Sequence, residues 1–279
     1  MMMGLGCNAA GVTGCRIIDT ERERLLAILT NALVPCNGRF PLLIALISLF
    51  WSGSAGAGGS LLSALLLAGL MALSLGMSFL MTWLLSRTLL RGEPSAFLLE
   101  LPPYRRPRIG KVLLRSLLDR TLFVLGRAAA VAAPAGALLW LLGRAGGEEN
   151  LLQRMAASMD GAGALLGMDG AILLGFLLGL PANEIVLPII LMIYAAAPAL
   201  TEPGSLSEIG AMLADRGWTA WTAGAVMLFS LFHWPCSTTL LTIKKETGRW
   251  RWTVLAALLP TAAGVLCCLL LELVRRMLG

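Results

Sequence analysis

The chain has 279 residues, of which 57% are hydrophobic and 14% are charged, and its formal net charge is +6. A mean hydropathy of +0.80 lies outside the usual range of soluble proteins, so the composition excludes an ordinary soluble enzyme and favours a helical membrane protein. We use the positive charge to orient loops across a membrane and infer no nucleic-acid partner from it, because Lys and Arg concentrate in cytoplasmic loops.

The first residues do not have the pattern of a signal peptide, because no basic segment precedes an apolar one. The chain opens on Gly6-Cys7-Asn8, and we interpret Leu5–Ile17 as the end of a membrane segment. The cysteines lie in or beside apolar segments, which argues against a disulfide framework. They are Cys7, Cys15, Cys36, Cys236, Cys267 and Cys268.

The segment Leu25–Phe50 is long enough to cross a membrane, but polar residues and prolines interrupt its middle. The interrupting residues are Asn31, Pro35, Cys36, Asn37, Gly38, Arg39 and Pro41. A continuous helix would lose backbone hydrogen bonds at two prolines and bury Arg39 at mid-depth. The sequence therefore predicts a helix, a break and a second helix, with the broken backbone enclosed by protein or by a polar cavity.

The stretch from Phe40 to Ser86 carries no acidic or basic residue and could cross a hydrocarbon core of about 30 Å twice. The Gly/Ser-rich segment Ser52–Ser60 would form the turn, and Leu61–Leu85 would be an unbroken, lipid-facing span. The excess of Arg and Lys from Arg87 to Arg120 places the next connector in the cytoplasm. Its last part, Ile109–Arg120, has the pattern of an amphipathic interfacial helix.

The next span, Thr121–Leu142, is followed by the net acidic stretch Arg144–Asp169, which we expect on the outside. The basic stretch Lys244–Arg251 is expected in the cytoplasm. Strict alternation of the spans then fails between Ala171 and Lys244. A re-entrant or broken element near Pro181 would restore it.

Two further apolar segments in the second half are interrupted. Ala171–Leu200 contains Gly-Leu-Pro-Ala-Asn-Glu ending at Glu184, and an unpaired carboxylate at mid-membrane costs several kcal/mol, which favours a functional role. Trp218–Ile243 contains His-Trp-Pro-Cys ending at Cys236. Thr253–Leu273 reads as a plain closing span, in which the two cysteines are packing residues.

The two halves share a layout, because the pair Pro35-Cys36 recurs as Pro235-Cys236 and each pair has an Asn-containing partner motif. Interrupted apolar segments at corresponding positions of two halves indicate the central site of a transporter.

The side chains at these breaks combine thiol, carboxylate, imidazole and amide groups. Such a mixed set suits Fe²⁺, Mn²⁺ or Zn²⁺ better than Na⁺ or Ca²⁺, which prefer oxygen ligands alone. The thiols of Cys7, Cys36 and Cys236 are equally compatible with ion ligation and with helix packing, and His233 is expected to pack beside Trp234. A single histidine excludes most catalytic triads, and the sequence contains no phosphate-binding loop, so no enzyme is predicted.

Five ordered segments resemble the ferrous iron transporter B (FeoB) family. They are Gly6–Arg16, Val34–Pro41, Glu100–Tyr104, Gly179–Glu184 and His233–Thr239 with Lys244–Thr247. The resemblance covers only the C-terminal membrane portion of that family, and implies an all-α, polytopic fold with broken or re-entrant helices in two Gate-type halves. The implied organisation is the C-terminal part of a first Gate region at 1–50, a membrane helix with the basic connector and interfacial helix at 51–120, and the second Gate region with the closing helix at 121–279.

The resemblance implies Fe²⁺ uptake across the bacterial cytoplasmic membrane, with pore-lining thiols at Cys7, Cys36 and Cys236. We predict an ion path lined by Cys7, Asn8, Cys36, Asn183, Glu184 and Cys236. Fe²⁺ would be the transported ion, and we expect the chain to bind no cofactor. Family members carry a GTP-binding domain, a helical regulatory domain and further membrane helices ahead of the first motif. The expected partners are therefore a separate N-terminal GTP-binding half and the lipid bilayer, homo-oligomerisation is left open, and these residues would not hydrolyse GTP.

Two alternatives stay open. The chain could be a Gate-type permease for a nucleoside or another small polar solute, although Phe232 and Trp234 are the only aromatic residues at the breaks that favour it. It could also be a non-transporting remnant of a split gene. The sequence leaves the choice among Fe²⁺, Mn²⁺ and Zn²⁺ undecided.

Overall fold

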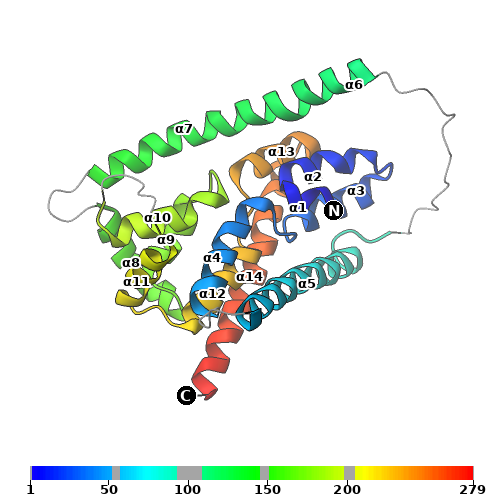
Figure 1. The fold of residues 1–279 in the computed structure, drawn as a ribbon. Helices are drawn as coiled ribbons and strands as arrows, with labels where there is room; N and C mark the ends of the chain where they lie inside the picture. The colour runs from blue at the N-terminus through cyan, green and yellow to red at the C-terminus, as the bar shows by residue number, and fades with distance from the viewer. Residues whose placement is uncertain (1, 52–56, 93–108, 145–150, 198–204, 279) are drawn as a thin grey trace.

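The computed structural model describes residues 2–51, 57–92, 109–144, 151–197 and 205–278, and within these ranges the regular elements are all helical (Figure 1). The α-helices are α1 Met2–Gly6, α2 Asn8–Gly14, α3 Glu21–Asn31, α4 Phe40–Phe50, α5 Ala57–Arg87, α6 Ile109–Ser116, α7 Phe123–Arg144, α8 Leu151–Leu165, α9 Gly170–Leu178, α10 Val186–Tyr194, α11 Leu206–Asp215, α12 Ala220–Phe232, α13 Ser237–Thr247 and α14 Trp250–Leu278. Short turns η1 Cys15–Ile17, η2 Asn37–Arg39 and η4 Asn183–Ile185 are 3₁₀-helical, and η3 Leu117–Leu122 is a π-helix. The motif Glu100–Tyr104 and most of the turn Ser52–Ser60 lie outside the described residues.

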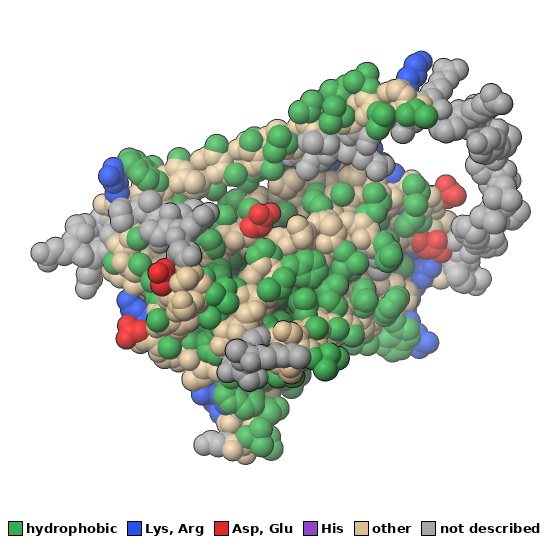
Figure 2. Space-filling model, viewed as in Figure 1, with side chains coloured by type: hydrophobic (Ala, Val, Ile, Leu, Met, Phe, Trp, Pro, Cys, Tyr) green, Lys and Arg blue, Asp and Glu red, His purple; other side chains and the backbone are tan. Residues whose placement is uncertain are grey.

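Three helical stretches among the described residues are long and apolar enough to cross a membrane: Gly58–Arg87, Ala220–Thr247 and Trp250–Leu278. A fourth results if the bent pair of α8 and α9 is counted as one span. Hydrophobic side chains cover much of the face in Figure 2, whereas the visible Lys and Arg lie near its edges. The predicted fold class, a polytopic helical membrane protein, is confirmed.

Helix α5 is the lipid-facing span that the sequence predicts, because only 11% of its most apolar window is buried. Its inner face nevertheless carries two buried hydroxyl groups. Ser74 Oγ donates to the carbonyl of Leu33 at 2.7 Å, and Ser78 Oγ donates to that of Thr30 at 3.4 Å. The carbonyl of Leu33 lies just beyond the end of α3, where helical partners are missing, whereas that of Thr30 also accepts from the backbone N–H of Leu33 at 3.1 Å. Helix α5 therefore donates hydrogen bonds to the backbone of the first break from its inner face, while most of its surface faces lipid.

The three predicted breaks are present. The first separates α3 from α4, the second separates α9 from α10, and the third separates α12 from α13. Each contains a proline, at Pro35, Pro181 and Pro235. A proline has no N–H to donate and disfavours the helical conformation of the preceding residue, so the helices end there.

The stretch Arg144–Asp169, which the sequence places in an outside segment, contains a helix that the sequence analysis did not predict. Helix α8 bends by 107° against α9, as in a re-entrant or broken span. Their close approach depends on Gly170, because a Cβ there would lie 1.9 Å from the carbonyl oxygen of Ala156. The irregular region in the second half thus begins before the predicted break near Pro181.

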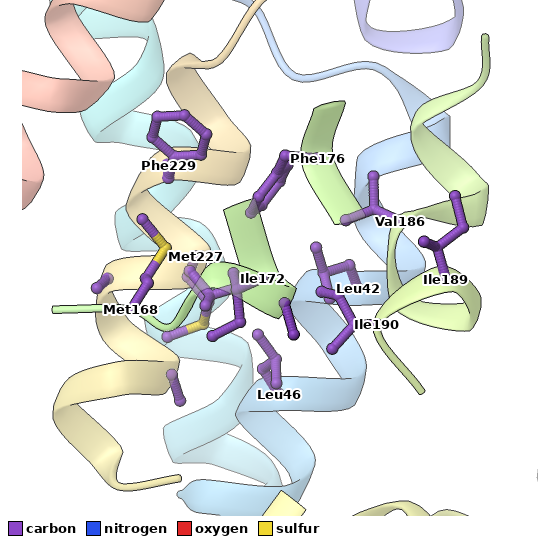
Figure 3. Close-up of a cluster of buried hydrophobic side chains, with 14 of the residues drawn as sticks. Leu42, Leu46, Met168, Ile172, Phe176, Val186, Ile189, Ile190, Met227 and Phe229 are labelled. Atoms are coloured by element: carbon purple, nitrogen blue, oxygen red, sulfur yellow. The ribbon is translucent and has the colours of Figure 1, made fainter. Parts of the chain in front are cut away.

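The core lies among α4, α9, α10 and α12. Figure 3 shows Leu42 and Leu46 of α4 lying with Ile172 of α9 and Ile190 of α10. Phe176 and Phe229 meet edge to face with ring centroids 4.9 Å apart, an arrangement that adds to the burial of their apolar surface. This core holds the second and third breaks together. Helices α6 and α7 form a long rod along one side of the molecule (Figure 1).

Candidate functional site: the meeting point of the three helix breaks

The second break contacts both of the others. On one side η4 packs against η2, where a Cβ on Gly38 would lie 3.0 Å from Cγ of Glu184. On the other side the backbone N–H of Ser237 donates to the carbonyl of Leu180 at 2.8 Å, and Ser237 Oγ donates to that of Pro181 at 3.5 Å. The three breaks therefore form one continuous region of non-helical backbone.

Three thiols occupy equivalent local positions in this region. Cys7 is the residue before α2, Cys36 precedes η2, and Cys236 precedes α13, and none of these side chains caps its own helix. Thiols are the side chains that bind soft and intermediate metal ions, and here each lies at a helix start with its sulfur not used as a cap.

The thiols differ in exposure. Cys7 is exposed, Cys36 is buried, and Cys236 is half-buried with its Sγ 3.3 Å from Oγ1 of Thr239. Within the described ranges, no three His, Cys, Asp or Glu side chains lie close enough to hold a metal ion together.

The predicted asparagines and glutamate occupy different surroundings. Asn183 is buried, and its side-chain amide lies 3.8 Å from Sγ of Cys36. Asn8 is buried too, but its amide nitrogen donates to the carbonyls of Gly4 and Val34 at 3.1 and 3.2 Å. Glu184 is exposed beside the first break. The structure thus brings Asn183 and Cys36 together, whereas Asn8 chiefly joins α2 to the first break.

Arg39 is a site residue whose role the sequence analysis missed. Arg39 is 1% exposed, so it is buried even though the helix is broken beside it. Its Nη1 donates to the carbonyls of Leu231 and Ala32 at 2.6 and 3.4 Å, and its Nη2 donates to that of His233 at 3.1 Å. These carbonyls lie at the C-terminal ends of α12 and α3, where helical partners are missing. The sequence signal for this role is an arginine that lies within an apolar segment interrupted by prolines.

His233 packs among aromatic rings, as the sequence predicts. Its ring centroid lies 5.0 Å from that of Phe176, 6.0 Å from that of Phe229 and 5.9 Å from that of Trp234. It also has a polar contact that the sequence analysis missed, because its Nε2 lies 3.3 Å from the side-chain amide of Asn183. Through this amide the third break is connected to Cys36 of the first.

The far ends of α2 and α13 are joined by an ion pair. Arg16 Nε and Nη2 donate to the two carboxylate oxygens of Glu246 at 2.7 and 2.6 Å. The hydrogen bond to this carboxylate raises the pKa of the Arg16 guanidinium. Helix α2 packs against α13. Cys7 and Cys236 lie at the start of these two helices, and the ion pair lies at their far ends. All six cysteines are free thiols.

Comparisons with known proteins match both halves of the chain. Residues 67–119 match the family model for the ferrous iron transport protein B C terminus, and residues 125–250 match the Gate model, described as nucleoside recognition. An Fe(2+) transporter FeoB from Staphylococcus aureus strain MSSA476 is 29% identical over 93% of this chain and 38% of the relative. The FeoB of Methanocaldococcus jannaschii is 29% identical over 92% of this chain and 38% of the relative. A fusion of Fe(2+) transport protein A with FeoB from Porphyromonas gingivalis is 24% identical over 91% of this chain and 35% of the relative.

No solved structure matches the chain. The chain spans 38% of the length of the first of these relatives, so the match concerns one part of a longer protein. The family models, the relatives and the broken membrane helices agree with one another. The chain is therefore similar to the C-terminal membrane portion of the ferrous iron transporter B family, and it contains regions that match the C-terminal and Gate family models.

Proposed function

We propose that this chain is the membrane-embedded part of a ferrous iron uptake transporter in a bacterial cytoplasmic membrane. Fe²⁺ passes through the region where the three breaks meet. The observation that carries the proposal is the placement of Cys7, Cys36 and Cys236 at the starts of three helices around one region of irregular backbone. The names of the relatives support ferrous iron as the substrate.

The backbone contributes less to the ion path than it does in many transporters with broken helices. There, free carbonyls at half-helix ends hold the cation. In this chain Arg39 binds the carbonyls of Leu231 and His233 at the end of α12. These two carbonyls are therefore not available to a cation, and the side chains at the breaks are its main candidate ligands.

The side chains at hand favour an ion of intermediate softness. Cys36 and Cys236 supply sulfur, Asn183 supplies an amide group, and Glu184 is an exposed carboxylate beside Gly38. Sulfur with oxygen suits Fe²⁺ better than Na⁺ or Ca²⁺. Because these groups do not converge on one point, each holds the ion weakly enough to release it, as conduction requires.

The proposal includes a separate GTP-binding partner, since the relatives extend well beyond the matched portion. The Lys244–Arg251 segment is basic and faces the cytoplasm by the positive-inside rule. The ion pair between Arg16 and Glu246 lies at the same end of α13. A cytoplasmic partner that moves α2 against α13 would act on both Cys7 and Cys236.

The test is anaerobic uptake of ⁵⁵Fe²⁺ by a bacterium that lacks its own ferrous iron transporter and co-expresses this chain with a GTP-binding half. We expect uptake to fall at least about tenfold in Cys36→Ser or Cys236→Ser, since sulfur is the principal soft ligand. Glu184→Gln should also lower it. Cys267→Ser is the matched control, because this half-buried thiol lies in α14 away from the breaks. Wild-type uptake in all three site variants would refute the proposed path.

A nucleoside permease is the second candidate, and the description of the Gate model favours it. The aromatic rings near the breaks argue against it, because Phe176, Phe229 and His233 are buried and pack against one another. Competition by nucleosides for ⁵⁵Fe²⁺ uptake distinguishes the two. Uptake of a labelled nucleoside without iron uptake would establish the second function.

A further inference from the structure

The side-chain amide of Asn183 lies between two partners, one end 3.8 Å from Sγ of Cys36 and the other 3.3 Å from Nε2 of His233. Asn183 is 6% exposed and His233 is 1% exposed, so solvent does not replace either contact. The nitrogen and oxygen of an amide have nearly the same shape. Which end faces which partner therefore follows from hydrogen-bond chemistry.

The imidazole of His233 decides the orientation. Its Nδ1 lies 2.9 Å from the carbonyl oxygen of Ser230, which can only accept, so Nδ1 carries the proton. In a neutral imidazole Nε2 is then an acceptor. The ring is 1% exposed and packs against Phe176, Phe229 and Trp234, an apolar surrounding in which a charged imidazolium would be costly. Nε2 therefore requires a donor.

We infer that His233 is a positioning residue that turns the amide of Asn183 so that its oxygen faces Cys36. The amide nitrogen donates to Nε2 of His233, and the thiol of Cys36 donates to the amide oxygen when no ion is present. The reverse orientation, in which the nitrogen faces the sulfur, would set the oxygen against Nε2 as two opposed acceptors. This inference rests on the proposed function and refines its ligand set.

The orientation matters to a passing cation. With its oxygen turned to Cys36, Asn183 offers an oxygen ligand beside a sulfur ligand. With the amide reversed, two N–H groups of partial positive charge would face the ion. Partners of this kind, which hold a ligand without touching the metal, alter metal affinity by roughly 10–100-fold in other proteins. His233 would therefore favour ions that accept oxygen, such as Fe²⁺ and Mn²⁺, over Cd²⁺, which is satisfied by sulfur.

The experiment is a double-mutant cycle on the purified chain in detergent, with anaerobic Co²⁺ titration followed by the thiolate-to-cobalt absorption band. His233→Phe keeps an aromatic ring and frees the amide, and should weaken Co²⁺ binding about tenfold. Cd²⁺ binding, measured by competition with Co²⁺, should change less than threefold. In the Asn183→Asp background an oxygen faces Cys36 in either orientation, so His233→Phe should cause no further weakening. His233→Gln, which keeps an acceptor oxygen, should retain most of the affinity.

The outcomes separate this inference from the proposed function. Weakening by Cys36→Ser and Asn183→Ala, with equal losses from His233→Phe in both backgrounds, would overturn the positioning role alone. Unchanged Co²⁺ affinity in Cys36→Ser and in Asn183→Ala would overturn both. If His233→Phe fails to yield a single monodisperse species, His233→Leu, which also lacks an acceptor, replaces it in the cycle. Its Cd²⁺-to-Co²⁺ affinity ratio must then rise over wild type in the Asn183 background and stay constant in the Asn183→Asp background, or the inference is overturned.

Discussion

The guanidinium of Arg39 and the backbone carbonyl of His233 join the first helix break to the third, with 3.1 Å between Nη2 and the oxygen. The same side chain binds the carbonyl of Leu231. A buried charge with good hydrogen bonds is tolerated, whereas unbound carbonyls at a helix end inside a membrane are costly. Arg39 is therefore a structural link between two parts of the proposed ion path.

Arg39→Met should destabilise the protein by about 3–5 kcal/mol, because several buried carbonyls lose a charged donor. Arg39→Lys should recover only part of this loss, since one ammonium group cannot reproduce the planar fork of donors. Thermal unfolding in detergent measures both. Arg251→Met is the control, since Arg251 is exposed near the start of α14. Equal melting temperatures for Arg39→Met and the control would contradict this role.

Gly170→Ala should disrupt the bend between α8 and α9. The new Cβ would lie 1.9 Å from the carbonyl oxygen of Ala156, a backbone atom that cannot move aside cheaply, so we expect a loss of about 3 kcal/mol or more. Gly161→Ala is the matched control within α8, because a Cβ there meets nothing within 4 Å. That variant should be neutral or stabilised by up to about 1 kcal/mol. Similar melting temperatures for the two variants would show that the helices do not approach closely at Gly170.

The ion pair between Arg16 and Glu246 should contribute little to the stability of the protein, but a swap of the two charges should be tolerated. Arg16 is 59% exposed, so solvent screens the pair, and Arg16→Glu should cost about 1 kcal/mol or less. The double variant Arg16→Glu with Glu246→Arg should restore the wild-type melting temperature and rate of ⁵⁵Fe²⁺ uptake. An additive loss in the double variant would mean that these side chains do not pair.

The breaks could be predicted from the sequence because their cause is local. Pro35, Pro181 and Pro235 each remove a backbone donor within an apolar segment, and the helices end beside all three. Helix α8 could also have been predicted, because Leu152 and Ala156 have the spacing of a buried helical face. The net acidic composition of that stretch suggested an outside segment instead.

The contacts between breaks could not be predicted because they join distant parts of the chain. Arg39 binds a carbonyl 192 residues away, and His233 meets an amide 50 residues away. Periodicity and composition report which residues share one helix face, not which helix ends meet. Cys36 and Cys236 were identified from their pairing with proline, and Cys7 from the motif Gly6-Cys7-Asn8. Their common position at helix starts became visible only in three dimensions.

The proposed ion path is tested most directly by protection of its thiols. Membranes containing the chain are treated anaerobically with a small methanethiosulfonate reagent, with and without Fe²⁺, and the labelling rate of each cysteine is read by mass spectrometry. We predict that Fe²⁺ slows labelling of Cys36 and Cys236 at least about tenfold, because a thiolate bound to metal is a poor nucleophile, while Cys267 reacts at an unchanged rate. Equal rates with and without Fe²⁺ at Cys36 and Cys236 would contradict the account.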